Sequence, residues 1–433
     1  MATNFSKTKL AAAVSAAAIA SPAGAVVIVG GNDGWEVSFD GNVNAFYTIG
    51  DYDAGYIGNT VDTDSARVTS GFLPAFFSFN VKTPTVGSLT GSARISFAPV
   101  IHTGGTKTQF NLQQNSQSVA GLDGISGAQI DTREVLANIS GPFGEVSFGR
   151  TLSLFGRNAI LLDMTLFGVG FAPGPGHFGS VTFGRVGHGY TYPDFAARIQ
   201  YTTPNINGFQ LAVGMYDPST FDLRGGNAPF SVSGSVFAAG GGILDETDIP
   251  RFEGEFSYAR SWDSGNMKLW ADGLWQTVDS TCSAVVGCND VDVRALGAGA
   301  QVGIGAWEVV GYYHSNDGLG LTAQFNSLGV GLDAAGNLAE REGDGYYVQG
   351  TYTFNGKTKV GVSYGEGNVD TLGTGDTIAA DLERSLWTVG VYHDVTSWLR
   401  VIAEYNRGEN HGGAPGGGDA EADTFSVGSF IFW

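Results

Sequence analysis

The stretch WEVSFDGNVNAFYTI, residues 35–49, alternates apolar and polar side chains along its length. Val37 and Val43 fall on one set of positions, while Glu36 and Asp40 fall on the other. Successive side chains of a strand point to opposite faces, so a period of two is typical of a strand with one apolar and one polar face. The same alternation recurs at 344–354 and at 398–406.

The composition favours strands and turns over helices. Gly accounts for 67 of the 433 residues, and each Gly in a helix interior costs about 1 kcal/mol relative to Ala. Charged residues make up 15% of the chain, below the roughly 25% of soluble domains. Beyond residue 25 no segment offers the run of about 18 apolar residues that a transmembrane helix needs. One large closed sheet is the architecture that remains.

The first 25 residues have the layout of a secretory signal peptide. Lys7 and Lys9 precede an apolar run at 10–20, and Ala23-Gly24-Ala25 forms an A-x-A cleavage site. The alternative is a short N-terminal helix. The whole chain has a net charge of −20, and removal of these two lysines leaves −22 on residues 26–433. Such acidity argues against nucleic acid as a partner.

Two cysteines, Cys282 and Cys288, lie close together between predicted strands. An exported chain folds in an oxidising compartment, so we expect them to close a small loop disulfide. Two free thiols are the alternative.

Period-two alternation predicts sixteen strands, an even number. They span 35–49, 67–83, 87–100, 131–140, 143–151, 195–204, 208–216, 250–260, 265–279, 290–304, 305–317, 343–355, 357–367, 383–394, 396–408 and 422–433.

The connections between these strands alternate in length. Seven are tight turns, at 83–87, 141–144, 204–208, 263–266, 303–306, 355–357 and 394–397. Eight are longer loops, at 50–66, 101–130, 152–194, 217–249, 280–289, 318–342, 368–382 and 409–421. This asymmetry places both ends of the sheet on the short-turn side and is typical of a closed up-and-down barrel in an outer membrane. A soluble sandwich would also alternate, but it has no reason to segregate loop lengths by side.

The tryptophans test this interpretation independently. Amphipathic rings gather at both membrane–water boundaries, so a spanning barrel should carry two aromatic girdles. Two tryptophans, Trp275 and Trp387, lie toward the long-loop ends of their strands. Five lie at the short-turn ends, namely Trp35, Trp262, Trp307, Trp398 and Trp433.

Motifs of catalytic or cofactor chemistry are weak in this sequence. Residues 174–179 match G-x-G-x-x-G but lack the strand–turn–helix setting that presents a helix N-terminus to phosphate, so we interpret them as a loop. The six histidines show no metal-ligand spacing, and G-x-S-x-G, H-E-x-x-H and Walker A motifs are missing. A catalytic group assembled across strands stays open, but nothing points to one. We expect no enzyme activity and no cofactor.

The loop at 152–194 carries apolar residues that an external loop has no use for. Ile160, Met164 and Phe167 recur at helical spacing and predict one face of a short helix. The barrel interior is the nearest place where these apolar side chains can be buried, so we expect this loop to fold inward and narrow the lumen. Packing against a neighbouring subunit or another loop is the alternative.

Two hairpins and the last strand resemble the general porins of Gram-negative outer membranes. The segment REVLANISGPFGEVSFGR, residues 133–150, resembles the strand–turn–strand that precedes the family's constriction loop. Residues 201–205, YTTPN, with Gly208-Phe209 resemble the next hairpin. The ending Phe430-Ile431-Phe432-Trp433 resembles the C-terminal strand, whose final aromatic residue is an assembly signal; the family usually ends in Phe. The resemblance covers residues 26–433 and is weak in the long loops.

This resemblance implies a 16-stranded, water-filled, trimeric pore in the cell outer membrane, exported through the periplasm. The implied partners are outer-membrane lipid and lipopolysaccharide, the outer-membrane assembly machinery, two further copies of the chain, and small hydrophilic solutes and ions. A barrel of sixteen strands leaves an aqueous channel, so passive diffusion is the predicted function. A substrate-selective channel and a non-conducting structural or adhesin barrel are the alternatives. A plugged transporter needs more strands and an N-terminal plug.

Residue alternation also predicts the pore constriction. Lys82, Arg94 and Arg198 fall on the lumen face, and Asp163 lies on the inward loop. Arg150 shares the outward parity of Phe148, so only the family pattern gives it an inward turn. We expect a basic wall opposed by a loop carboxylate, which sets a transverse field across the pore; ordinary solvated lumen charge is the alternative.

The long loops carry half of the 42 acidic residues. A mouth of one sign concentrates counter-ions, so we expect a modest cation preference at low salt. Because salt screens a wide mouth more than a narrow constriction, this preference should fade or reverse as salt rises. Divalent cations that bridge the acidic outer loops are a further expectation.

Overall fold

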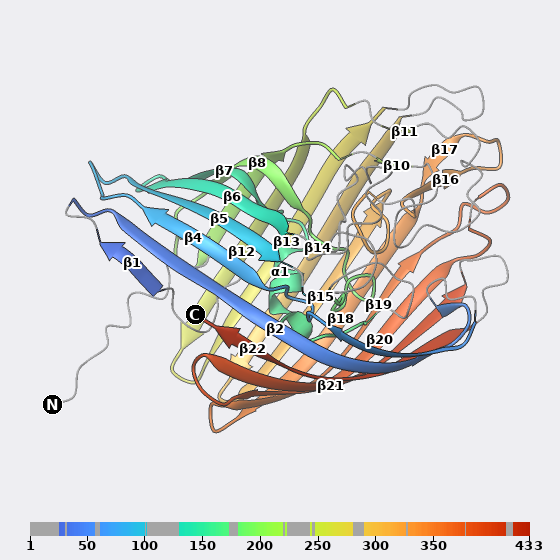
Figure 1. The fold of residues 1–433 in the computed structure, drawn as a ribbon. Helices are drawn as coiled ribbons and strands as arrows, with labels where there is room; N and C mark the ends of the chain where they lie inside the picture. The colour runs from blue at the N-terminus through green and yellow to red at the C-terminus, as the bar shows by residue number, and fades with distance from the viewer. Residues whose placement is uncertain are drawn as a thin grey trace.

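The computed structural model describes most of the chain (Figure 1). It describes residues 26–30, 33–56, 61–99, 101, 130–172, 181–219, 221–222, 243–244, 247–279, 290–325, 328–376, 378–412 and 419–433. The predicted signal peptide, Cys282 and Cys288 lie outside these ranges. No described helix is long and apolar enough to cross a membrane.

One antiparallel sheet closes on itself to form a barrel (Figure 1). Its strands are β2 (Glu36–Tyr52), β3 (Thr63–Thr69), β4 (Phe76–Lys82), β5 (Thr90–Pro99), β6 (Ile130–Gly141), β7 (Gly144–Leu152), β8 (Phe195–Thr202), β9 (Phe209–Tyr216), β12 (Arg251–Trp262), β13 (Gly265–Val278), β14 (Val291–Ile304), β15 (Trp307–Asp317), β18 (Glu342–Phe354), β19 (Thr358–Val369), β20 (Leu382–Asp394), β21 (Leu399–Gly412) and β22 (Ala420–Phe432). Closure comes from β22, which pairs with β2 from Asn42↔Phe432 to Tyr52↔Ala422.

The second strand of the barrel is interrupted. β3 pairs with the Phe46–Tyr52 half of β2, and β4 pairs with the Glu36–Asn42 half, so the two are halves of one strand. The barrel therefore has the predicted sixteen strands. The sequence predicts no break within 67–83, and the inward loop described below explains it.

In the described residues, three short strand pairings lie outside the barrel wall. β1 (Val26–Gly30) pairs with the first residues of β2. On the long-loop side, β10 (Phe221–Asp222) pairs with β11 (Ile243–Leu244), and β16 (Val330–Leu332) pairs with β17 (Leu338–Glu340).

The predicted bounds of all sixteen strands are confirmed to within four residues. The turns follow from local chemistry. At the β18–β19 turn, Asn355 and Gly356 have φ of 50° and 66°, the left-handed pair that an Asn-Gly hairpin turn requires. The alternation of tight turns with long loops is confirmed as well.

The outer surface of the barrel is apolar and carries the predicted girdles. On β22, exposed Phe425, Val427 and Ile431 alternate with buried Thr424 and Ser426, which point inward. Trp35, Trp262, Trp307 and Trp398 are exposed at the short-turn ends of their strands, and Trp275 and Trp387 are exposed toward the opposite ends. Of the two other tryptophans, Trp433 follows β22 and is half-buried, and Trp270 lies inside the barrel and stacks on Tyr312.

Candidate functional site

The inward loop, which we define as residues 152–194, enters the barrel as predicted. Its described parts are 152–172 and 181–194. Figure 1 shows its helix α1 (Arg157–Leu162) in the space that the strands enclose. Leu154, Phe155 and Ile160 on this loop are at most 5% exposed. A loop packed on the outside of the barrel is therefore excluded for these residues.

The predicted helix is two short helices rather than one. α1 ends at Asp163, and the 3-10 helix η2 (Met164–Phe167) starts there. The Asp163 carboxylate accepts a hydrogen bond from the backbone N–H of Thr165 at 2.9 Å, which caps η2. It also accepts one from the hydroxyl of Tyr190 at 2.8 Å. Asp163 is 3% exposed, so the prediction that it faces the aqueous lumen is wrong: the carboxylate is used to shape the loop.

Apolar packing holds the loop against the inner wall. Ile160, Met164 and Leu166 are buried in one cluster with Trp270 and Tyr392 of the wall. Each such side chain contributes roughly 1.5–3 kcal/mol on burial. Ile160, Met164 and Phe167, whose spacing predicts a helix, therefore form the apolar face that packs against the barrel wall.

Polar groups of the wall hold the backbone of the loop. The Glu253 carboxylate accepts the N–H groups of Leu154 and Phe155 at 2.7 and 2.9 Å. The Glu404 carboxylate accepts those of Val169 and Gly170, both at 2.8 Å. Asp272 accepts the N–H of Gly156 at 3.2 Å, and the Gln349 amide accepts that of Met164 at 2.8 Å. The bonds to the wall carboxylates are charge-assisted and strong, and together with the Gln349 bond they fix the path of the loop from β12 to β21.

Glu404 also explains a glycine. A Cβ at Gly168 would lie 1.8 Å from the nearer oxygen of Glu404, so only Gly lets the carboxylate come this close. The same oxygen, Oε1, accepts a hydrogen bond from the Tyr392 hydroxyl at 2.6 Å.

The break between β3 and β4 makes room for the same loop. Residues 70–75 are all buried. The N–H of Phe72 donates to the carbonyl of Gly168 at 2.9 Å, and that of Leu73 donates to the carbonyl of Leu166 at 3.2 Å. The wall backbone thus leaves the ladder to satisfy the loop backbone, which is the physical reason for the interruption.

Arg94 is the predicted constriction residue whose position is best defined. On the inner face of β5 it forms ion pairs with Asp40 at 2.8 Å and with Glu134 at 2.7 Å. Its remaining donors reach Asn80 at 2.8 Å and Ser78 at 2.7 Å. All five N–H donors of a guanidinium are used in this arrangement. Two carboxylates on one arginine leave the cluster with a net charge of −1, so Arg94 is not the exposed basic wall that we expect from the sequence.

Two other arginines of the lumen are also neutralised. Arg157 of α1 pairs with Glu255 at 2.9 Å. Arg251 pairs with Glu253 at 3.0 Å, and the side chains of both are fully buried.

The other predicted constriction residues are spread apart. Arg198 points inward but is 7% exposed, because it lies beneath the start of the loop and donates to the carbonyl of Leu152 at 2.8 Å. Lys82 ends β4 and is exposed, opposite Glu36 and Ser92. In the ladder Lys82 lies diagonally beside Arg94, whereas Arg198 and Asp163 bond the backbone of the loop, so the four do not form a basic wall opposed by a free carboxylate.

The predicted inward turn of Arg150 is wrong. Arg150 pairs with Val135 and Ala197, which both lie on the outer face. Gly149 has φ of 118°, yet the ladder runs through it without a register shift, so Arg150 keeps the face of Phe148.

Trp433 lies beside β2. Its N–H and carbonyl pair with Gly41, both at 3.1 Å, and its ring contacts those of Phe39 and Phe77. Its role as an assembly signal stays a prediction.

A second long loop, at 318–342, also folds inward in its described part, which we did not predict from the sequence. Leu319, Leu321 and Phe325 of the β15–β18 connection are at most 3% exposed. The N–H of Tyr192 on the inward loop donates to the carbonyl of Thr322 at 2.7 Å. The sequence does contain a signal for this burial, because 318–325, like 152–194, carries apolar residues that an exposed loop does not need. The hairpin that follows is turned by Asp333, where hydrogen bonds from the backbone and side chain of Asn337 lower the pKa of the carboxyl.

Within the described ranges no three His, Cys, Asp or Glu side chains are arranged to hold a metal ion. The arrangement is that of a barrel whose interior is narrowed by a pinned loop.

The family model of Gram-negative porins matches residues 10–413. The chain is a member of the Gram-negative porin family. Because the family is one of porins, the molecule is an integral outer-membrane barrel that serves as a diffusion channel.

Solved structures show the same fold at low sequence identity. The outer membrane channel DcaP of Acinetobacter baumannii has a TM-score of 0.63 and 14% identity, covering 94% of this chain and 99% of that one. The anion-selective porin of Comamonas acidovorans has a TM-score of 0.57 and 15% identity, covering 92% and 100%. The trimer form of OmpT of Vibrio cholerae has a TM-score of 0.50 and 15% identity, covering 92% and 99%. The search among curated protein sequences found no significant match.

Proposed function

We propose that this porin passes small hydrophilic solutes without strict selection and prefers cations over anions at low salt. The observation that carries the proposal is the pairing of Arg94 with both Asp40 and Glu134. A guanidinium whose donors are all engaged offers nothing to a passing anion, and the extra carboxylate attracts cations. Arg157 and Arg251 have carboxylate partners of their own, so they do not restore a basic lumen.

The charge outside the barrel acts in the same direction. The chain carries 42 acidic against 22 basic residues. A mouth of one sign raises the local concentration of counter-ions, but the field decays over about 8 Å at physiological ionic strength. The cation preference should therefore be strongest in dilute salt and fade as salt rises.

The variant D40N/E134Q tests the assignment to the Arg94 cluster. Removal of both carboxylates converts the cluster from −1 to +1, so the reversal potential in a KCl gradient should shift toward the chloride value. Glu308→Gln is the matched control, because Glu308 is also a lumen-side carboxylate, one-third exposed, and only 3.9 Å from a lysine. Equal shifts in the two variants would contradict the assignment.

We also propose that three copies assemble through the wall at β7–β9. These strands have nine, eight and eight residues, whereas β13, β14 and β21 have fourteen each. A membrane-spanning strand needs about 9–11 residues. A charged side chain on the lipid face is costly, up to roughly 2–4 kcal/mol at mid-depth, so Arg150 on the outer face of β7 is better placed against protein.

The mass of the protein in mild detergent tests this assembly. We expect three copies before heating and one copy after it. A single copy under all mild conditions would contradict the proposal.

A further inference from the structure

The inward loop exposes only a few side chains inside the barrel. In its described parts, 152–172 and 181–194, five residues are not buried, namely Arg157, Leu161, Leu162, Phe167 and Asp194. Three of these five are apolar, and they pack against the buried cluster that holds the loop to the wall. We define Leu161, Leu162 and Phe167 as the apolar strip. The surface that the described loop turns to the lumen is therefore mainly apolar.

The apolar strip lies where the lumen opens toward the short-turn side. On the inner face of β13, Lys268 near the short turn is partly exposed, whereas Trp270 and the inner residues beyond it are buried. The same step from partly exposed to buried occurs on β15, β18, β20 and β21. Phe167 lies at this level, since its ring contacts those of Phe430 and Phe432 at the short-turn end of β22. A solute that crosses the lumen therefore passes the apolar strip on the short-turn side of the loop.

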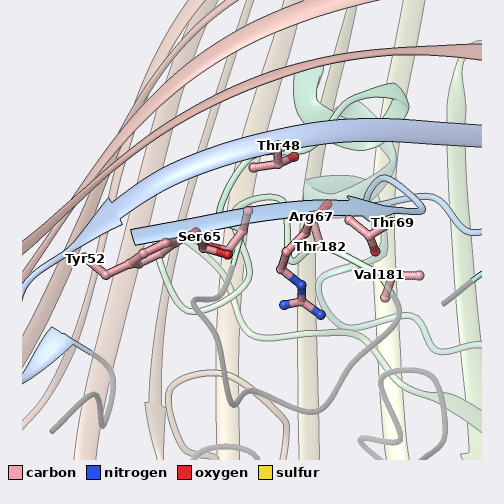
Figure 2. A pocket seen from close by; sticks show the side chains of 8 residues that line it. Thr48, Tyr52, Ser65, Arg67, Thr69, Val181 and Thr182 are labelled. Atoms are coloured by element: carbon pink, nitrogen blue, oxygen red, sulfur yellow. The ribbon is translucent and has the colours of Figure 1, made fainter. Parts of the chain in front are cut away.

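The second arm of the loop offers no comparable surface. Every residue from 181 to 193 is buried. Val181 and Thr182 lie against β3, at the small pocket that Figure 2 shows beside Thr69. Contact between a solute and the described loop is therefore concentrated on the first arm, which carries the apolar strip.

Paired charges flank the apolar strip at both ends. Arg157, at the start of α1, pairs with Glu255 at 2.9 Å. At the other end, the guanidinium of Arg400 lies 5.3 Å from the centroid of the Phe167 ring. Arg400 also pairs with both oxygens of Asp394, at 2.6 and 3.0 Å. Both signs of charge thus lie close to an apolar surface that offers no hydrogen bond.

Such a surface discriminates between solutes of equal size. Removing apolar solute surface from water is favourable, whereas a solute hydroxyl pressed against leucine or phenylalanine loses hydrogen bonds to water. A solute with a short alkyl or aromatic group is therefore stabilised beside the apolar strip relative to a hydroxylated one.

We propose that the apolar strip makes this porin prefer small amphipathic solutes, which carry an alkyl or aromatic group beside a charged or polar end, over hydroxylated solutes of equal size. The inference rests on the proposed passage of small solutes without strict selection, and it names the class that passes fastest. The strip takes the place of the lumen-facing loop carboxylate that we expect from the sequence, because Asp163 is buried.

The swelling of proteoliposomes in isosmotic valine or threonine tests this preference. The two amino acids have nearly the same shape and charge, and valine has a methyl group where threonine has its hydroxyl. After subtraction of the rate for protein-free vesicles, we expect valine to enter about twofold faster, since the strip covers only one side of the solute. Equal rates, or faster entry of threonine, overturn the proposal and leave diffusion intact. Entry of neither contradicts the proposed diffusion and the preference together.

Two double variants separate the polarity of the apolar strip from the position of the loop. L161Q/L162Q keeps good helix formers in α1 but makes most of the strip polar, so the valine preference should disappear. L161M/L162M keeps the strip apolar at similar volume, so the preference should remain. Loss of the preference in both double variants, or in neither, overturns the proposal.

Leu136→Gln is the matched control on the barrel wall. Leu136 is a partly exposed apolar residue on the inner face of β6, but its direct cross-strand partner is Arg94, so it belongs to no apolar strip. This variant should keep the valine preference, and a loss equal to that in L161Q/L162Q would contradict the proposal by making the effect one of general lumen polarity. Heat-modifiable mobility in gels confirms that each variant is folded, and conductance in KCl shows whether the width of the channel is unchanged.

Discussion

Glu404 and Gly168 show how single residues set the position of the inward loop. The carboxylate is 1% exposed and accepts two backbone N–H groups of the loop and one wall hydroxyl. Glycine is the only residue type that fits against this carboxylate at position 168. Charge inside this porin therefore has a structural use as well as an electrostatic one.

A double-mutant cycle on this pair is the test at the residue scale. Gly168→Ala alone forces a Cβ against Glu404 and should lower the free energy of unfolding by about 1–3 kcal/mol. In the background of Glu404→Ala the same substitution should cost much less, because the space has been vacated. Urea unfolding in detergent measures both.

Gly350→Ala is the control for this cycle, since a Cβ at Gly350 meets nothing within 4 Å. It should be nearly neutral in both backgrounds. An equal cost for Gly168→Ala with and without Glu404 would contradict the packing described here.

At the scale of elements, the strands could be predicted from the sequence, whereas the side-chain pairings inside the barrel could not. Alternation gives every barrel strand because the two faces of each strand meet different solvents, lipid outside and polar lumen inside. It even places Glu404 on the polar face of 398–406. Parity says which face a residue takes, but it does not say which acid meets which arginine. The pairing of Arg94 with Asp40 and Glu134 joins three different strands, so it depends on register and tilt.

For the inward loop, burial could be predicted from the sequence, but the detailed local structure could not. Its apolar residues predict burial, and the structure confirms it for the described parts. The split into α1 and η2 depends on Asp163, whose two partners are a nearby N–H and a distant tyrosine. The β3–β4 break depends on the loop in turn, and its local signal within 67–83 is Gly71 and Pro74, since Pro cannot donate to a ladder.

At the scale of the whole molecule, three features act together. The chain is acidic, Arg94, Arg157 and Arg251 are paired with carboxylates, and the inward loop is held by hydrogen bonds to the wall. Hydrogen bonds from the loop backbone to four wall side chains, together with the backbone bonds of residues 70–75, hold the described parts of the loop against the wall from β12 to the β3–β4 break. The open channel should therefore have one stable width, and its ionic preference should come from fixed charge. A mobile gate is not needed to explain either property.

The reversal potential of single wild-type channels, recorded across a KCl gradient in dilute and in concentrated salt, measures whether fixed acidic charge sets the ionic preference of the pore. The account predicts steady open channels with a cation preference in dilute salt that shrinks toward zero as salt screens the acids. An anion preference that grows as salt is lowered would contradict it, because unpaired arginines would then set the field of the pore.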